Sequence, residues 1–180
     1  MSKFEHYSFA AKKALVRVDF NVPLNANFEI TDATRILASL PTIQKIIKDN
    51  GSVILLSHLG RPKSGPENKF SLLHLLKYLQ EVLPDVVIRF VADCIGQEVT
   101  EAANRLAPRE ILLLENVRFY PEEEKGDAGF AKQIASLGDV YVNDAFGTAH
   151  RAHATTAIMA NYFAKENKMF GMLMEAEVSN

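Results

Sequence analysis

Short, almost continuously apolar runs alternate along this chain with longer segments whose apolar residues recur at helical spacing. The clearest of these runs occupy residues 14–20, 52–57, 86–91, 111–114 and 140–143. Continuous apolar runs are typical of strands that are covered on both faces. Their alternation with helical patterns predicts βαβ units around a mostly parallel sheet.

The segment between the first two runs predicts a long helix. It begins near Thr31 and Asp32, which supply capping side chains, and reaches residue 49, with Pro41 as an expected kink. Asn50 and Gly51 are typical of a helix end. Further helices are expected at residues 71–83, where Ser71 is the cap, and at residues 97–107, 128–137 and 155–164.

Three segments do not fit this alternation. Residues 60–69 are rich in Gly, Pro and Lys and predict a loop. Residues 121–127 are acidic, and we interpret them as a solvated loop. The apolar run 169–174 is too short to assign by periodicity, so it is either a last strand or the start of a helix.

Length and composition limit the number of domains and the kinds of partner. Against roughly 150 residues per domain, the 180 residues allow one good-sized domain and leave no room for two ordinary ones. With 48% hydrophobic and 23% charged residues, the chain can bury a core. Twenty Lys and Arg against 22 Asp and Glu give a net charge of -2, which excludes the basic field of a nucleic-acid binder or a membrane anchor.

The single cysteine, Cys94, indicates a reducing compartment. It can form no internal disulfide, and no thiolate zinc site can be built on it, so an inert buried role is expected. The N-terminus shows no pattern of a cleaved leader, and no apolar run approaches the roughly eighteen residues of a membrane span. We therefore expect a cytoplasmic protein.

Polar and basic side chains follow four of the predicted strands. In a parallel sheet, ligands bind beyond the carboxyl ends of the strands, so these side chains are the candidate site. Arg35 joins them if the start of the first long helix lies at the same edge. The strand-end residues are Asp19 and Asn21, His58 and Arg61, Glu115 and Arg118, and Asp144, His150 and Arg151.

This combination predicts a small anionic ligand. Several guanidinium groups at one edge suit a molecule with more than one carboxylate or phosphate. Asp19 and Asn21 suit a hydroxyl between the charged ends, so the ligand is a phosphorylated hydroxy acid or a sugar phosphate. Taken singly, each arginine could instead form a surface ion pair, and His58 or His150 a structural hydrogen bond. His6, His74 and His153 are read as structural.

Nucleotide and metal motifs are absent from the sequence. Gly60 and Gly65 have the spacing of a phosphate-binding loop, but Pro66 and Glu67 stand where Lys and Ser or Thr are required. No G-x-G-x-x-G follows the first strand. The isolated histidines define no metal site. The chain is therefore expected to hold its anion by side chains, with no metal or cofactor.

Five segments resemble phosphoglycerate kinase: VRVDFNVPL, ITDATR, LLSHLGRP, LLLENVRFYPEEE and DVYVNDAFGTAHRAHATT, in that order. The resemblance implies reversible phosphoryl transfer from 1,3-bisphosphoglycerate to ADP, giving 3-phosphoglycerate and ATP in glycolysis. Together with the patterning it implies an α/β fold, a three-layer α/β/α Rossmann-like domain with a mostly parallel sheet of about six strands.

The resemblance also implies roles for the strand-end residues. Asp19 and Asn21 would bind the glycerate. Arg35 would be the catalytic residue, placed where the phosphoryl group is transferred, in a mechanism of positioning and charge stabilisation. The backbone around Gly147 and His150 is a lesser candidate. A basic patch of His58, Arg61, Arg118 and Arg151 would take the 3-phosphate.

The resemblance covers one of the family's two domains. Residues 1–180 would be the N-terminal, phosphoglycerate-binding domain, while Mg-ATP or Mg-ADP would be bound by a C-terminal domain absent from this chain. We expect a monomer that folds alone, binds 3-phosphoglycerate and turns nothing over without that partner domain. Two alternatives are a non-catalytic binding module with this fold, and an unrelated sugar-phosphate enzyme using Asp19, Glu115, Asp144 or a histidine as acid or base.

Overall fold

The computed structural model describes residues 3–63, 65–148 and 151–180, and a parallel sheet organises this part of the chain. The strands are β1 (Lys13–Arg17), β2 (Ser52–Leu56), β3 (Val87–Val91), β4 (Glu110–Leu114), β5 (Val140–Asn143) and β6 (Lys168–Phe170). Among the described residues they form one six-stranded sheet in the order β3-β4-β2-β1-β5-β6. Every pairing between them is parallel, which confirms the predicted fold class.

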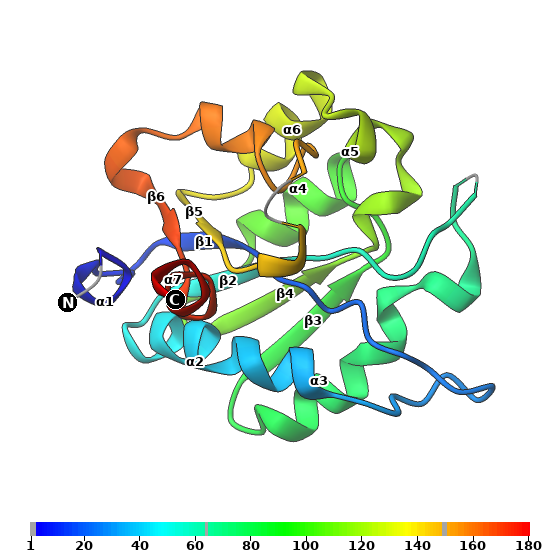
Figure 1. Cartoon of the computed structure of the whole chain (residues 1–180). Helices are drawn as coiled ribbons and strands as arrows, with labels where there is room; N and C mark the ends of the chain where they lie inside the picture. Colours follow the sequence, from blue (N-terminus) through cyan, green and yellow to red (C-terminus); the bar gives the residue numbers. More distant parts are fainter. Residues whose placement is uncertain (1–2, 64, 149–150) are drawn as a thin grey trace.

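Helices cover both faces of this sheet, giving three layers (Figure 1). The α-helices are α1 (Lys3–His6), α2 (Thr34–Lys48), α3 (Leu76–Val82), α4 (Gln97–Asn104), α5 (Pro121–Lys125), α6 (Ala128–Ala135) and α7 (Met172–Ser179). Short 3-10 helices are η1 (Asn68–Phe70), η2 (Leu72–Leu75), η3 (Val117–Phe119), η4 (Phe146–Thr148), η5 (Ile158–Tyr162) and η6 (Lys165–Asn167).

Alternate residues of the strands feed two separate cores. Val16, Val53 and Leu55 pack with the apolar faces of α2 and α3 on one side of the sheet. Leu15 and Ile54 pack with α4 and α6 on the other side. A strand buried on both faces is typically a near-continuous apolar run, which is why most strand positions are apolar in the sequence.

The predicted long helix is α2, and its boundaries follow from local chemistry. The carboxylate of Asp32 accepts hydrogen bonds from the backbone and the hydroxyl of Thr34, the first residue of the helix. Pro41 lies inside the helix. Asn50, which follows the C-cap residue Asp49, has a φ of 66°, so the helix ends where the sequence indicates.

Two sequence-based expectations are wrong. Residues 121–127 are not a solvated loop: they contain α5, and Glu123 in it is fully buried. Residues 155–164 do not form a full helix, because the backbone N–H groups of Ala154 and Thr155 bond to Glu123 and only η5 follows.

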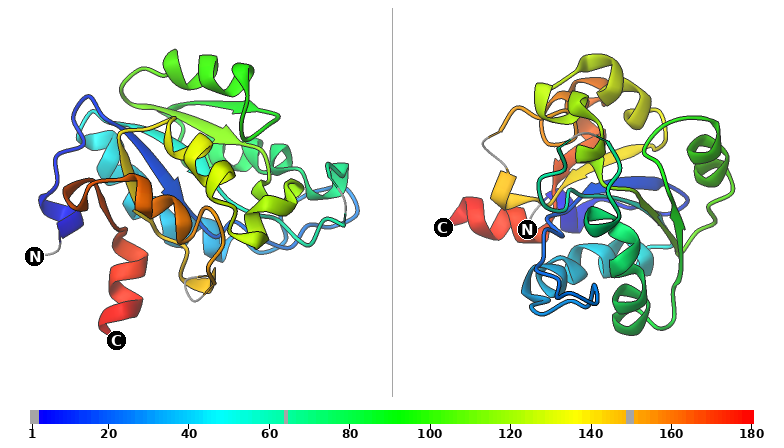
Figure 2. Two further views of the ribbon diagram at one scale, coloured as in Figure 1. Left: turned by 90° about the horizontal axis from the view of Figure 1, so that it is seen from above. Right: turned by 90° about the vertical axis from the view of Figure 1, so that its right-hand side faces the viewer.

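The undecided segment 169–174 contains both of the alternatives. It begins in strand β6, turns at Gly171 and continues into α7. Figure 2 shows α7 extending from the body of the molecule to the C-terminus. Its first turn is anchored, since Met172 N–H donates to the hydroxyl of Thr42 in α2.

Candidate functional site

The carboxyl ends of β4, β2, β1 and β5 lie next to one another in the sheet. The segments that follow these four strands therefore meet at one edge, as the sequence analysis requires. Five basic side chains belong to this edge, which we call the basic rim: Arg35, His58, Arg61, Arg118 and Arg151.

Asp19, Asn21 and Arg35 form one corner of the site. Arg35 Nη1 lies 3.4 Å from Asp19 Oδ1 and donates a 2.8 Å hydrogen bond to the carbonyl of Asn21. The Arg35 side chain is 54% exposed and that of Asp19 is 15% exposed. Gly147 packs against them, since a Cβ there would lie 2.6 Å from Asp19 Oδ2. The corner places a carboxylate, an amide and a guanidinium within reach of one small ligand.

Hydrogen bonds from two asparagines hold the loop after β2 in place. Asn21 Oδ1 accepts a 2.8 Å bond from the N–H of Gly60. Asn116 Nδ2 donates to the carbonyls of Leu59 and Phe70, at 2.7 and 2.9 Å. Gly60 has a φ of 62° and lies against the Phe70 ring, a conformation that glycine adopts without strain. The loop that carries His58 and Arg61 is thereby fixed from both sides.

Arg118 is the most deeply placed arginine of the basic rim. Asn116 caps η3 by accepting the N–H of Arg118, and Arg118 Nη1 donates to the Gly60 carbonyl at 3.3 Å. Only 9% of Arg118 is exposed, and its Nε is buried with no hydrogen-bond partner among the described residues. Burial lowers the pKa of Arg118, and the positive charges of Arg17 and Arg151 add to the effect.

His58 is buried beside Arg17, a residue that the sequence analysis did not select. Arg17 Nη2 lies 3.1 Å from His58 Nδ1. Burial lowers the pKa of His58 to about 2, and the charges of Arg17, Arg118, His153 and Arg35 reinforce that shift. His58 is therefore neutral at physiological pH.

A buried counter-charge accompanies Arg17. Glu123 Oε2 lies 3.8 Å from Arg17 Nη2, and both side chains are fully buried. The hydroxyl of Thr155 links the two side chains, since it donates to Glu123 at 2.6 Å and accepts from Arg17 Nε at 2.8 Å. The signal for Arg17 was its position as a charge inside an apolar strand, because a buried charge needs a partner.

His153, interpreted from the sequence as structural, lies in the same cluster of charges. It is 7% exposed, and its Nδ1 is buried with no partner among the described residues. Burial lowers its pKa, while the charge of Glu123 opposes that shift. His153 thus places a further buried ring nitrogen, Nδ1, near the basic rim with no hydrogen bond within the described part of the chain.

The remaining candidates lie at the surface or outside the described residues. Arg61 and Arg151 are exposed. Thr148 and Thr156 fix the Arg151 backbone, since the Thr148 carbonyl accepts its N–H and the Thr156 hydroxyl donates to its carbonyl. His150 lies outside the described residues. Contacts and electrostatic interactions therefore link Asp19, Asn21, Arg35, His58 and Arg118. Arg61 follows Gly60 of this group in the sequence, and the charge of Arg151 acts on Arg118.

Glu115 and Asp144, two of the carboxylates considered as acids or bases from the sequence, form structural hydrogen bonds instead. Glu115 accepts bonds from the hydroxyl of Ser71 and the N–H of Leu72. Asp144 accepts the N–H of Met174 at the start of α7. Only Asp19 of the three lies in the corner with Arg35.

The described residues contain no metal-binding cluster and no candidate membrane span. No group of three or more His, Cys, Asp or Glu there could hold a metal ion. Within the same ranges no helix is both long and apolar enough to cross a membrane. Cys94 is buried, donates to the Glu115 carbonyl and has a pKa raised by burial, as an inert thiol should.

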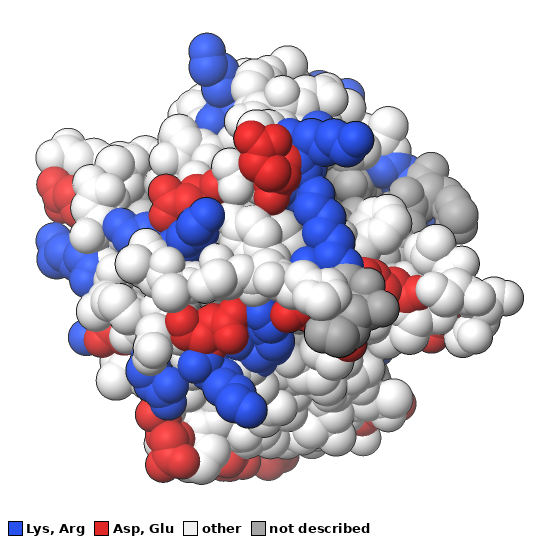
Figure 3. All heavy atoms as spheres, turned by 90° about the vertical axis from the view of Figure 1, so that its left-hand side faces the viewer, with Lys and Arg blue, Asp and Glu red and all other residues white. Residues whose placement is uncertain are grey.

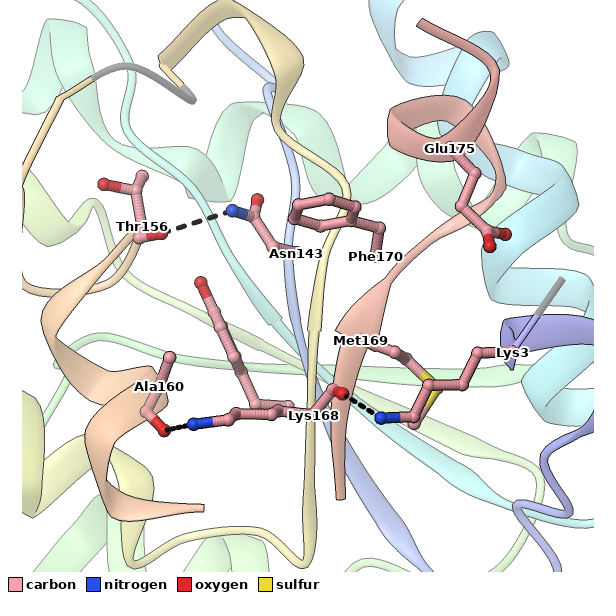
Figure 4. Close-up of a pocket in the computed structure, with 9 residues that line it drawn as sticks. Lys3, Asn143, Thr156, Ala160, Lys168, Met169, Phe170 and Glu175 are labelled. Carbon is pink, nitrogen blue, oxygen red and sulfur yellow. Dashed lines mark hydrogen bonds between the residues drawn. The ribbon is translucent and has the colours of Figure 1, made fainter. Parts of the chain in front are cut away.

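An apolar hollow of about 390 Å³ opens beside β6 and is lined by Tyr141, Met169 and Phe170 among others. Its amines are already bonded, Lys3 Nζ to the Lys168 carbonyl and Lys168 Nζ to the Ala160 carbonyl (Figure 4). No arginine is among its described lining residues. On the face that carries the chain ends, basic and acidic side chains are interspersed (Figure 3). The basic rim remains the candidate site for an anion.

Comparisons with known proteins agree with this arrangement. Among curated relatives, phosphoglycerate kinase of Porphyromonas gingivalis is 51% identical over 197 residues, covering 97% of this chain and 47% of that protein. That of Moorella thermoacetica is 53% identical over 167 residues, covering 93% of this chain and 41% of the relative. The chain thus spans about half the length of the curated relatives it matches.

Solved structures give the same result. The phosphoglycerate kinase of Coxiella burnetii matches with a TM-score of 0.84 and 37% identity, over 97% of this chain and 42% of that one. That of Pyrococcus horikoshii matches with a TM-score of 0.87 and 30% identity, over 99% of this chain and 44% of that one. Since the family model for phosphoglycerate kinase also matches residues 4–180, this chain belongs to the phosphoglycerate kinase family.

Proposed function

We propose that this chain supplies the 3-phosphoglycerate-binding part of a phosphoglycerate kinase. In the complete reaction a phosphoryl group passes from 1,3-bisphosphoglycerate to ADP, giving 3-phosphoglycerate and ATP. Family membership supports the reaction, and the basic rim supports the choice of ligand. The residues of the basic rim converge at the carboxyl ends of the strands, where α/β proteins bind small molecules.

The observation that carries the proposal is the buried Nε of Arg118, which has no hydrogen-bond partner among the described residues. A buried polar group without a hydrogen bond is costly, and such groups are usually completed by a ligand or a water. Arg118 also lies among other cations, since the charges of Arg17 and Arg151 lower its pKa. A phosphate group would supply both the missing acceptor and the missing negative charge.

The other residues fit the rest of the ligand. Asp19 and Asn21 would hold the glycerate hydroxyl, and Arg61 and Arg151, both exposed, would close on the phosphate. Arg35 is half exposed and is held beside Asp19, so its guanidinium could stabilise the negative charge that develops at the carboxyl end during transfer. His150 and the backbone around Gly147 would be lesser contacts.

The nucleotide belongs to a different part of the assembly in this proposal. Mg-ATP or Mg-ADP would be bound by the portion of the longer relatives that this chain does not span. That portion is the expected partner of this chain, in a monomeric cytoplasmic enzyme. Residues 1–180 would hold the phosphoglycerate substrate, which as 1,3-bisphosphoglycerate is the phosphoryl donor when the reaction runs towards ATP.

The test compares two arginine variants by calorimetric titration with 3-phosphoglycerate. Arg118→Ala should weaken binding by about 1.5–3 kcal/mol, the value of a charge-assisted hydrogen bond. Arg105→Ala is the matched control. Arg105 is exposed at the end of α4, which leads into the amino end of β4, whereas the basic rim lies at the carboxyl ends of the strands. Equal affinities for the two variants would remove Arg118 from the site and the main support for the proposal.

A further inference from the structure

Arg17 is a buried cation for which phosphate binding alone gives no reason. It is fully buried in β1, and each nitrogen of its guanidinium has a partner. Nε donates to the Thr155 hydroxyl, Nη1 to the Val18 carbonyl and Nη2 contacts His58 Nδ1. Each of the three guanidinium nitrogens therefore has a partner within the protein, and the side chain is fully buried.

The contact with His58 determines which ring nitrogen carries the proton. A guanidinium has only donors and stays protonated in proteins. At 3.1 Å, Arg17 Nη2 must therefore donate to a lone pair on His58 Nδ1. The proton of the neutral ring then lies on Nε2.

Neighbouring charges oppose a second proton on this ring. Arg17 lies on β1, Arg118 on η3, Arg35 on α2, and His153 on the segment after η4, and all four act against a positive His58. The carboxylate of Glu123 of α5 is paired with Arg17, 3.8 Å from its Nη2. His58 is surrounded by cations and stays neutral.

We propose that Arg17 is a positioning residue, anchored by Glu123 and Thr155, that fixes His58 in the Nε2–H form as a neutral donor to the ligand phosphate. This inference rests on the proposed function. In this arrangement the arginines neutralise the charge of the phosphate, while the neutral His58 ring donates one directional hydrogen bond to it.

The anchoring of Arg17 is rigid enough for this role. Glu123 Oε1 accepts the N–H of Thr155 at 2.9 Å, and the Tyr141 hydroxyl donates to the Thr155 carbonyl at 2.7 Å. The residues that hold Arg17 thus come from α5, β5 and the segment before η5. Such support keeps a site residue in one geometry before the ligand arrives.

The direct test is nitrogen NMR of the whole chain with 15N-labelled histidine, without ligand, from pH 5 to 8. The proposal predicts that His58 shows an unprotonated Nδ1 and a protonated Nε2 throughout. Adding 3-phosphoglycerate should shift the Nε2–H signal. Protonation at Nδ1, or an imidazolium at pH 6, would overturn the proposal whether or not the ligand binds.

Two substitutions at His58 separate a neutral donor from a cation. Gln is neutral and keeps an N–H donor, so His58→Gln should weaken 3-phosphoglycerate binding less than about threefold, and His58→Ala about tenfold, the value of one hydrogen bond. Equal losses in the two variants would contradict the neutral-donor role. If the native chain binds no 3-phosphoglycerate, the proposed function fails, and the NMR result still decides whether Arg17 sets the tautomer.

A change at Arg17 completes the test. Lys cannot reach His58, Thr155 and the Val18 carbonyl together, because it offers one ammonium in place of a planar fork. Arg17→Lys should therefore release the His58 tautomer, with Nδ1 protonated in part of the population. If the variant keeps the native tautomer, Arg17 is not what positions the ring. If it does not fold, the spectrum of the native chain alone decides.

Discussion

Arg17 and Glu123 show at the scale of single residues how a buried charge depends on its partner. Neither was selected from the sequence, because Arg17 lies within an apolar strand run and Glu123 within an acidic stretch interpreted as solvated. Asp19, Asn21 and Arg118 could be predicted from the sequence, because they directly follow predicted strands and ligands bind beyond the carboxyl ends of parallel strands. Pairing across more than a hundred positions of sequence, as between Arg17 and Glu123, requires the fold.

Breaking this pair should destabilise the protein strongly. Glu123→Ala leaves Arg17 buried without its counter-charge, which typically costs about 3–5 kcal/mol. The adjacent Glu124 is exposed, so Glu124→Ala should change stability by less than about 0.5 kcal/mol. Urea denaturation of both variants measures the difference, and similar midpoints would show that the buried pair is not needed.

Stability should fall on acidification because of His58. Its pKa in the folded chain is lowered to about 2, against an unfolded value of about 6.5. The unfolded chain therefore binds the proton first, and the stability present above about pH 6.5 is lost as pH falls below it, by at most about 1.4 kcal/mol per pH unit. His58→Gln should remove this slope in urea titrations at pH 5–7, whereas parallel curves for the two chains would contradict it.

At the scale of elements, the connection between β5 and α7 depends on Asp144. Its Oδ1 accepts the N–H of Met174, and its Oδ2 is buried without a partner among the described residues. Gly171 allows this close approach, because a Cβ there would lie 2.4 Å from Asp144 Oδ1. The sequence left 169–174 undecided, since an apolar run of that length fits a strand or a helix and only the sheet edge and this cap distinguish them.

Asp144 should give α7 a pH dependence of the opposite sign to that of His58. Burial raises the pKa of Asp144 to about 6, above the unfolded value of about 3.9. The folded chain binds this proton more tightly, so stability is present below about pH 4 and is lost as pH rises through about 6. Asp144→Asn keeps the acceptor without the charge and should gain stability relative to the native chain between pH 4 and 8. A constant difference across that range would mean that Asp144 does not titrate there.

At the scale of the whole molecule, the sheet divides the chain into two cores and collects the site at one edge. The alternation of strands and helices was enough to predict a parallel α/β domain. The order β3-β4-β2-β1-β5-β6 was not predictable, because nothing in an apolar run specifies its neighbours. The order nevertheless decides the site, since it brings the loops after β4, β2, β1 and β5 side by side.

The chain alone should transfer no phosphoryl group. The proposed site binds only one of the two substrates, the phosphoglycerate. The relatives that the chain matches are about twice its length. A coupled assay with 3-phosphoglycerate and Mg-ATP should give only the background rate. Turnover well above background by the pure chain would mean that the nucleotide also binds here.

The most direct test of the account is a calorimetric titration of the native chain with 3-phosphoglycerate at low and raised salt, with Mg-ATP titrated separately. We expect saturable binding of 3-phosphoglycerate in the range of about 10 μM to 1 mM, weakened by salt, and no binding of Mg-ATP. Absence of 3-phosphoglycerate binding, or a preference for Mg-ATP, would contradict the assignment of the basic rim as the phosphoglycerate site.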